Sequence, residues 1–191
     1  YILFYRLGDF YEMFFDDAVT ASRELDLVLT GKDCGQKERA PMCGVPYHSC
    51  EAYIARLIDK GYKDAICEQT EDPSAAKGLV KREVVRIVTP GTNMNTQSLD
   101  ESRNNYLMCV IYSGTSYGIS VVDVTTGDFY LTETEHLSKA EDEMIKFAPK
   151  EILCNPVFMM SGLNMDELKE RYHFVVTVLD DHIYDTTACE Q

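Results

Sequence analysis

The chain has 191 residues, a length that suits two compact domains, since domains commonly hold roughly 100–200 residues. Its hydrophobic content of 45% allows an ordinary globular core. No segment approaches the about 18 consecutive apolar residues that a membrane span needs. No export signal is recognisable, so nothing in the sequence argues for export. Because the chain opens at Tyr1, directly in an expected strand, we interpret it as part of a longer protein.

The seven cysteines are scattered along the chain and include no C-x-x-C pair. This usage favours free thiols in a reducing cytoplasm over a disulfide framework. Cys43, His48 and Cys50 lie close together in sequence, but their spacing matches no zinc-binding pattern. We therefore predict no metal site.

A formal net charge of −14 is unusual for a free-standing nucleic-acid binder, which commonly has a basic surface. Residues 1–100 carry 12 Lys and Arg against 16 Asp and Glu, a net of −4. Residues 101–191 carry 6 against 16, a net of −10. The charge balance favours a nucleic-acid contact in the first half and a protein-facing role in the second.

Aromatic and β-branched residues over 1–7 predict a strand, and residues 10–14 continue extended after a Gly-Asp interruption. A helix is expected over about 16–25, with Ala18, Ala21, Leu25 and the Val19 edge buried. The rest of the first half is expected to form a strand over 27–30, a Gly- and Pro-rich loop over 31–47, a helix capped by Ser49 through Lys60, a strand over 65–68, a helical turn at Asp72-Pro73 and a strand over 80–89.

The polar stretch over 93–104 lacks periodicity and predicts a linker between a first domain, 1–92, and a second, 105–191. The second domain is expected to form strands over 105–112, 117–123 and 127–134, then a helix over 138–147, a strand over 151–154, a helix over 165–172 and a strand over 174–178. Three antiparallel strands followed by alternating helix and strand is the order of a ribonuclease H-like domain.

Motifs of common enzymes are missing. The sequence has no phosphate-binding G-x-x-x-x-G-K-[ST] loop and no H-E-x-x-H, G-x-S-x-G or G-x-G-x-x-G motif. A metal-dependent nuclease of the ribonuclease H-like class is the alternative, with Asp123 and Asp128 as its candidate metal ligands. However, the first strand of that domain carries no carboxylate, so turn-forming acids are the favoured interpretation, and we predict no catalytic residue.

Phe10 and Glu12 are the most informative pair. In an extended chain they point to the same side of the strand. A Phe wedge can enter the minor groove and kink the duplex, and a neighbouring Glu can hydrogen-bond a displaced base. A mismatch is cheaper to unstack than a matched pair. From the residues alone, however, burial in a strand core is the commoner role for such a pair.

Residues 5–14 (YRLGDFYEMF) resemble the mismatch-binding segment of MutS family proteins, whose Phe-x-Glu motif maps onto Phe10 and Glu12. Further matches follow in order at 41–48 (PMCGVPYH), 65–69 (AICEQ) and 84–92 (VVRIVTPGT), and 123–129 (DVTTGDF) is similar to the family's connector domain.

The resemblance implies an α/β fold of two domains, a mixed-sheet mismatch-binding domain and a ribonuclease H-like connector. It implies a binding module for mismatched double-stranded DNA in mismatch repair, with Phe10 stacking and Glu12 hydrogen bonding at the mispair. The connector would contact a MutL-type partner and relay to an ATPase. As DNA-backbone contacts we nominate four basic residues: Lys32, Lys81, Arg82 and Arg86.

Other expectations concern the full-length protein. No cofactor is expected within these residues, whereas ATP and Mg²⁺ are expected in the full-length protein, together with a homodimer in the bacterial cytosol, associated with the nucleoid. A third interpretation is a MutS relative that has lost mismatch recognition. The intact FYE sequence at 10–12 argues against it.

Overall fold

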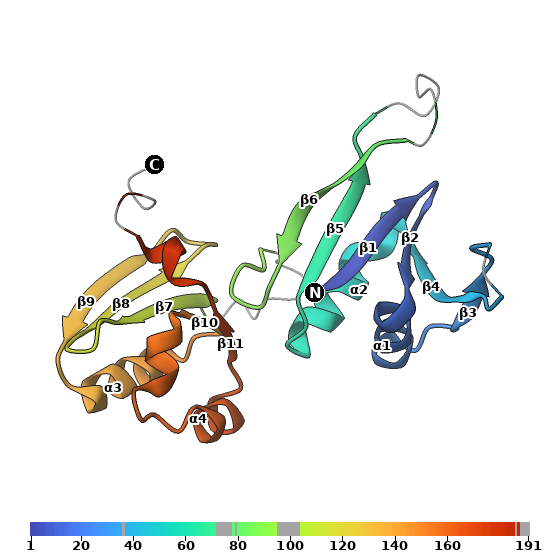
Figure 1. Cartoon of the computed structure of the whole chain (residues 1–191). Coiled ribbons are helices and arrows are strands. Elements are labelled where there is room, and N and C mark those ends of the chain that lie inside the picture. Colours follow the sequence, from blue (N-terminus) through green and yellow to red (C-terminus); the bar gives the residue numbers. More distant parts are fainter. Residues whose placement is uncertain (36, 72–77, 79, 95–103, 186, 188–191) are drawn as a thin grey trace. The chain divides into compact units, whose positions relative to one another are not determined.

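The computed structural model describes residues 1–35, 37–71, 78, 80–94, 104–185 and 187, and it divides into two compact units, Tyr1–Thr89 and Pro90–Gln191 (Figure 1). Each unit has a sheet of its own and a separate hydrophobic core. Among the described residues, no helix combines the length and the apolar character that a membrane crossing requires. The α/β fold class with two mixed sheets is confirmed.

The described part of the first unit forms a six-stranded mixed sheet in the order β3-β4-β2-β1-β5-β6. Only the pair β1 and β5 is parallel, and the other neighbours are antiparallel. The strands are β1 (Ile2–Leu7), β2 (Phe10–Phe14), β3 (Thr30–Lys32), β4 (Ala40–Pro46), β5 (Asp64–Gln69) and β6 (Arg82–Val88).

Strands β1 and β2 form a tight hairpin. Leu7 pairs with Phe10, so residues 8–9 make the turn, and Gly8 adopts a φ of 58° that favours glycine. The interruption expected at Gly-Asp is therefore a hairpin turn, and the extended conformation expected over 10–14 is confirmed. The turn fixes which residues of β2 face the core.

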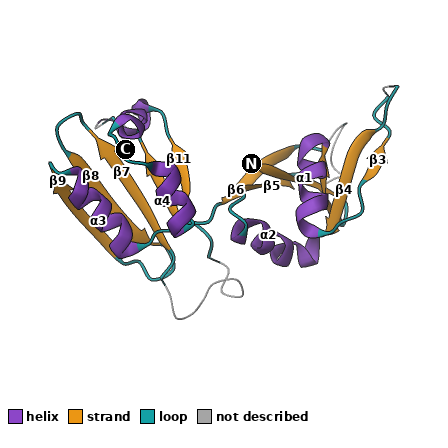
Figure 2. Ribbon diagram, turned by 90° about the horizontal axis from the view of Figure 1, so that it is seen from below, coloured by secondary structure: helices purple, strands orange, loops and turns teal. Residues whose placement is uncertain are grey.

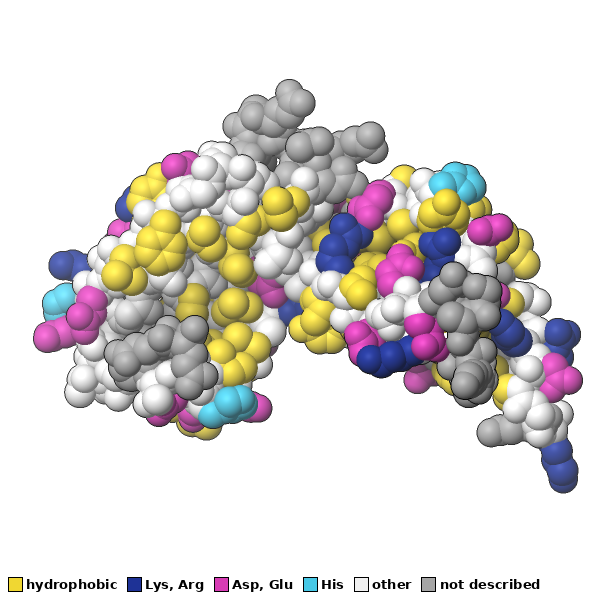
Figure 3. Space-filling model, turned by 90° about the horizontal axis from the view of Figure 1, so that it is seen from above, with side chains coloured by type: hydrophobic (Ala, Val, Ile, Leu, Met, Phe, Trp, Pro, Cys, Tyr) yellow, Lys and Arg dark blue, Asp and Glu magenta, His cyan; other side chains and the backbone are white. Residues whose placement is uncertain are grey.

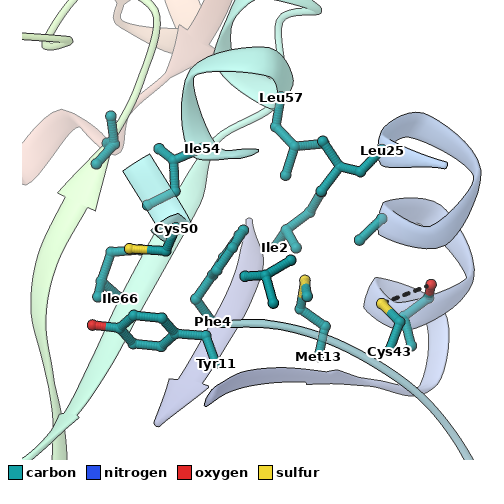
Figure 4. Packing of buried hydrophobic residues seen from close by; sticks show 14 of the residues in the cluster. Ile2, Phe4, Tyr11, Met13, Leu25, Cys43, Cys50, Ile54, Leu57 and Ile66 are labelled. Atoms are coloured by element: carbon teal, nitrogen blue, oxygen red, sulfur yellow. Dashed lines mark hydrogen bonds between the residues drawn. The ribbon is translucent and has the colours of Figure 1, made fainter. Parts of the chain in front are cut away.

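Helices α1 (Phe15–Leu25) and α2 (Cys50–Asp59) cover one face of this sheet (Figure 2). Figure 4 shows their side chains packed against Ile2, Phe4, Tyr11 and Met13 of the first two strands. The predicted burial of Ala18, Ala21 and Leu25 is confirmed. The predicted burial of Val19 is wrong, because this residue lies about 100° around the helix axis from Ala18 and is 45% exposed.

The segment between α1 and α2 differs from the prediction. Residues 27–29 are not a strand, and the expected loop over 31–47 contains most of β3 and all of β4. Two prolines and a glycine weaken the local strand signal of β4. Pairing with β2 along five residues, and burial of Cys43 and Val45, override that signal.

Ser49 occupies the predicted N-cap position of α2, but its side chain does not cap the helix. Residues Tyr47–Ser49 form a 3₁₀ turn that precedes α2. Within it, the Ser49 hydroxyl donates to the Pro46 carbonyl oxygen at 3.2 Å, and it accepts no helix N–H. The turn therefore uses the hydroxyl that an N-cap would need.

The described part of the second unit forms a five-stranded sheet in the order β11-β10-β7-β8-β9. Strands β7, β8 and β9 are antiparallel, whereas β10 pairs in parallel with both β7 and β11. Helices α3 and α4 cover one face (Figure 2). The bounds are β7 (Tyr106–Tyr112), β8 (Tyr117–Asp123), β9 (Phe129–Thr134), α3 (Leu137–Phe147), β10 (Glu151–Cys154), α4 (Met165–Tyr172) and β11 (Val175–Val178).

Every helix and strand predicted for the second unit is present, with ends that move by at most two residues. Its chain order is the one expected of a ribonuclease H-like domain: an antiparallel meander, then helix and strand in alternation. Buried and partly exposed residues alternate along β8, which is the pattern typical of a strand. The local sequence was therefore sufficient to predict this element.

The residues that follow β6 pack with the second unit. The Gly91 amide donates to Glu151 Oε2 at 3.3 Å, and the Asn105 side-chain amide donates to the carbonyl oxygens of Pro90 and Asn93, both at 3.1 Å. The compact units accordingly divide between Thr89 and Pro90, earlier than the sequence suggested. Most of the predicted linker, and the turn at 72–73, lie outside the described residues.

Candidate nucleic-acid interface

The sheet face opposite α1 and α2, which we call the open face, carries the predicted pair. Along β2, Tyr11 and Met13 point into the core and are 4% and 0% exposed. Alternation therefore turns Phe10 and Glu12 to the open face together. The predicted shared side of these two residues is confirmed by this burial pattern.

Phe10 is the first residue of β2, directly after the hairpin turn. It is 48% exposed, although it pairs with Leu7 on one side and Pro46 on the other. A Phe in the core would be almost fully buried. The structure therefore excludes the core role that the residues alone would have favoured.

Glu12 is held by Lys32. The Lys32 Nζ donates to Glu12 Oε2 at 2.5 Å, and the two side chains are 42% and 18% exposed respectively. The same ammonium lies 5.4 Å from the centroid of the Phe14 ring, a favourable cation–π distance. Lys32 was predicted to contact the DNA backbone, and its partner in the structure is instead the second residue of the predicted motif.

Contacts on the core side brace the hairpin that carries Phe10. The Arg6 guanidinium lies 3.7 Å from the centroid of the Tyr47 ring, and its Nε donates to the Gly8 carbonyl oxygen at 2.5 Å. The Tyr47 amide donates to the Asp9 carbonyl oxygen at 3.0 Å. Sequence reasoning missed Arg6 and Tyr47, although both lie inside segments that carry the family resemblance.

Tyr11 fixes the same hairpin from the core side of the sheet. Its hydroxyl donates to the Glu68 carboxylate on β5. Burial, followed by the hydrogen bond and the charge of Glu68, raises the pKa of Tyr11 far above its usual value. The phenol therefore stays a donor at any physiological pH, and the strand under Phe10 is fixed to the sheet.

The other basic candidates also have partners inside the first unit. Lys81 forms an ion pair with Glu83 at 2.5 Å. Arg82 lies 5.1 Å from the centroid of the Tyr5 ring and donates to the Arg6 carbonyl oxygen at 2.9 Å. Arg86 pairs with Glu51 of α2 at 2.5 Å.

These basic residues do not form one continuous patch. Figure 3 shows basic side chains of the first unit separated by acidic and hydrophobic ones. Arg82 reaches Tyr5 and shares the open face with Phe10, whereas the contact of Arg86 with α2 places it on the helix-covered side.

The two acids considered as metal ligands shape a turn. Asp123 is fully buried, and its carboxylate accepts hydrogen bonds from the Asn105 amide and from the amide and hydroxyl of Thr125. Burial raises the pKa of Asp123, but these hydrogen bonds outweigh it and leave the pKa below its usual value. Asp128 accepts from the Thr126 hydroxyl at 2.9 Å. Nowhere in the described chain do three or more His, Cys, Asp or Glu side chains gather as a metal site would require.

The chain is thus a two-domain α/β protein whose first sheet carries an exposed aromatic ring beside a carboxylate on its open face. The family model described as MutS domain I matches residues 1–97, and the model described as MutS domain II matches residues 105–187. The chain belongs to the MutS family of DNA mismatch repair proteins.

Three relatives match nearly the whole chain. The DNA mismatch repair protein MutS of Lachnoclostridium phytofermentans is 63% identical over 185 residues, covering 97% of this chain and 20% of that protein. Those of Acetivibrio thermocellus and Ruminiclostridium cellulolyticum are 55% and 53% identical, with 96% of this chain and 22% and 21% of their own lengths covered. The chain spans about a fifth of the length of these curated relatives.

Proposed function

We propose that this chain recognises mismatched base pairs in duplex DNA through Phe10 and Glu12. The observation that carries the proposal is the half-exposed Phe10 ring at the tip of a braced hairpin, on the same face as Glu12. An exposed aromatic ring on a rigid support is suited to stacking against a base, because stacking works with any base.

Discrimination follows from the cost of opening the base step. Phe10 enters from the minor groove and separates a base step, which kinks the duplex. A mispaired base is already poorly stacked, so the wedge costs less there than at a matched pair. Glu12, on the same side of the strand, accepts a hydrogen bond from the displaced base.

The remaining parts of the function belong to the full-length protein. We propose that it is a homodimer that binds ATP and Mg²⁺, and that this chain is its DNA-reading module and not its catalytic part. The second unit is the connector, which meets a MutL-type partner and relays DNA contact to the ATPase. Lys81, Arg82 and Arg86 remain candidates for backbone contacts once their contacts within the first unit open.

A pair of titrations tests the proposal. In the full-length protein, Phe10→Ala should remove about 1–3 kcal/mol of stacking at the mismatch, so that matched and mismatched duplexes bind almost alike. Phe129→Ala is the control, because Phe129 is also an exposed ring, 63% against 48% for Phe10, and it lies on β9 of the second unit. Discrimination that survives Phe10→Ala would refute the proposal.

A further inference from the structure

The ion pair on the open face spans an intervening strand. Lys32 lies on β3, and β4 separates β3 from β2, so the lysine side chain crosses β4 to reach Glu12. Gly44 lies opposite Glu12 on β4, where a Cβ would stand 3.5 Å from the Cγ of Glu12 and 3.1 Å from the Tyr11 carbonyl oxygen. The missing side chain at Gly44 leaves space beside Glu12.

The ion pair between Lys32 and Glu12 uses only one of the two carboxylate oxygens of Glu12. Lys32 donates to Oε2, and within the described residues no hydrogen bond reaches Oε1. The contact of the ammonium with the Phe14 ring gives the lysine a second fixed point. Glu12 is therefore held through one oxygen while the other can accept a hydrogen bond from a ligand.

We propose that Lys32 is a positioning residue for Glu12, and that it stays on the carboxylate when DNA binds. This inference rests on the proposed function, since it takes Glu12 as the residue that meets the mispaired base. Lys32 would act in two ways. It limits the rotation of the Glu12 side chain, which lowers the entropy lost on binding, and it neutralises a carboxylate that neighbouring phosphates would repel.

A positioning lysine and a phosphate-binding lysine have different signatures. A residue that contacts a phosphate weakens binding about uniformly across sequences when it is removed, and it lowers the slope of log affinity against log salt by about one. A residue that positions Glu12 affects the mismatched duplex more than the matched one. Its effect also disappears when Glu12 is absent.

The experiment is a set of titrations of the full-length protein with matched and mismatched duplexes at several salt concentrations. Lys32→Met should lower the ratio of mismatched to matched affinity by about tenfold, as expected for loss of a well-placed hydrogen bond to a charged group. The salt slope should stay within half a unit of the unmodified protein. Lys32→Arg, which keeps the charge and the donors, should restore the ratio.

Two further variants isolate the mechanism. In a Glu12→Gln background, Lys32→Met should leave the ratio unchanged, because the carboxylate on which it acts is gone. Lys60→Met is the matched control: Lys60 pairs with Glu24 at 3.1 Å, and these side chains are 45% and 19% exposed, close to the values for Lys32 and Glu12. The control should change neither the ratio nor the slope.

The outcomes separate this inference from the proposed function. An equal loss for both duplexes with a slope lower by about one would overturn it in favour of a phosphate contact, and no change with Lys32→Met would overturn it outright. Persistent discrimination in Phe10→Ala refutes the proposed function instead, whatever Lys32 does. A thermal melt accompanies each variant, and if Lys32→Met lowers the melting temperature, Lys32→Gln replaces it in the same comparisons.

Discussion

The Phe10 side chain can take part in recognition because other residues of β2 form the buried side of the strand. Tyr11 and Met13 supply the buried side of the strand, so the core does not need the Phe10 ring. Phe10→Ala should therefore change the free energy of unfolding by no more than about 0.5 kcal/mol, as for other surface positions. A thermal melt checks this. A loss of about 3–5 kcal/mol, the cost of deleting a buried Phe, would mean that the ring is structural.

Glu12 contributes selectivity at the expense of attraction to DNA. Glu12→Ala removes the hydrogen bond to the base together with a negative charge, and it leaves the Lys32 ammonium free to attract phosphates. Discrimination should fall while binding to a matched duplex stays level or rises. Parallel titrations with the two duplexes measure both effects. A matched-duplex affinity that falls as far as the mismatched one would contradict this role.

Asp64 predicts an unusual dependence of stability on pH. It begins β5, it is fully buried, and neither carboxylate oxygen has a hydrogen-bond partner among the described residues. Burial raises its pKa to about 8, and the nearby Asp17 adds to the shift. The folded chain therefore holds a proton that the unfolded chain releases near pH 4.

Because the folded state binds more protons between about pH 4 and pH 8, the contribution of Asp64 to stability is fully present below pH 4 and is lost as pH rises through 8. Asp64→Val should remove this slope and raise stability at pH 8 by about 1–3 kcal/mol, the cost of an unsatisfied buried group. Urea unfolding at a series of pH values measures it. Equal slopes for the two proteins would exclude a buried, unpaired Asp64.

At the scale of elements, the sequence predicts helices and strands correctly where the local pattern and the tertiary packing favour the same conformation. The alternation of β8 and the apolar spacing of α2 predicted those elements. β4 was missed because its prolines and glycine read as a loop, and its strand conformation depends on pairing with β2.

The same reason limits how much of the site could be predicted. Phe10 and Glu12 are neighbours in one strand, so alternation sufficed to place them together. The partnership of Glu12 with Lys32 joins residues 20 positions apart across β4, the strand that local signals did not reveal. Contacts of this kind follow from sheet order, which the sequence of a single segment does not determine.

The junction of β2 and α1 holds backbone strain. Phe15, the first residue of α1, has a φ of 52° and is 62% exposed. The left-handed conformation costs an L-residue roughly 1–2 kcal/mol. Phe15→Gly should therefore raise stability by about 1 kcal/mol, measured by chemical unfolding. Val19→Gly, at an exposed helical position without this strain, should lower stability, and a loss in both variants would show that Phe15 is not strained.

For the whole molecule, the negative charge is distributed unevenly between the two units. The acidity is concentrated beyond residue 100, whereas the exposed aromatic site lies in the first unit. An acidic second unit is repelled by phosphates and suits contact with protein. This division supports DNA reading by the first unit and a connecting role for the second.

Because each unit has its own hydrophobic core, we predict that the two units unfold independently. Ile54 in the first core is 2% exposed and Ile152 in the second is 0% exposed, so they form a matched pair of probes. Ile→Val at either position should cost about 0.5–1.5 kcal/mol. Ile54→Val should speed amide hydrogen exchange in β1 and leave β7 unchanged, and Ile152→Val should do the reverse, because each core stabilises its own sheet. If either variant accelerated exchange in both sheets equally, the two units would be a single cooperative structure, and the division of labour proposed for them would lose its physical basis.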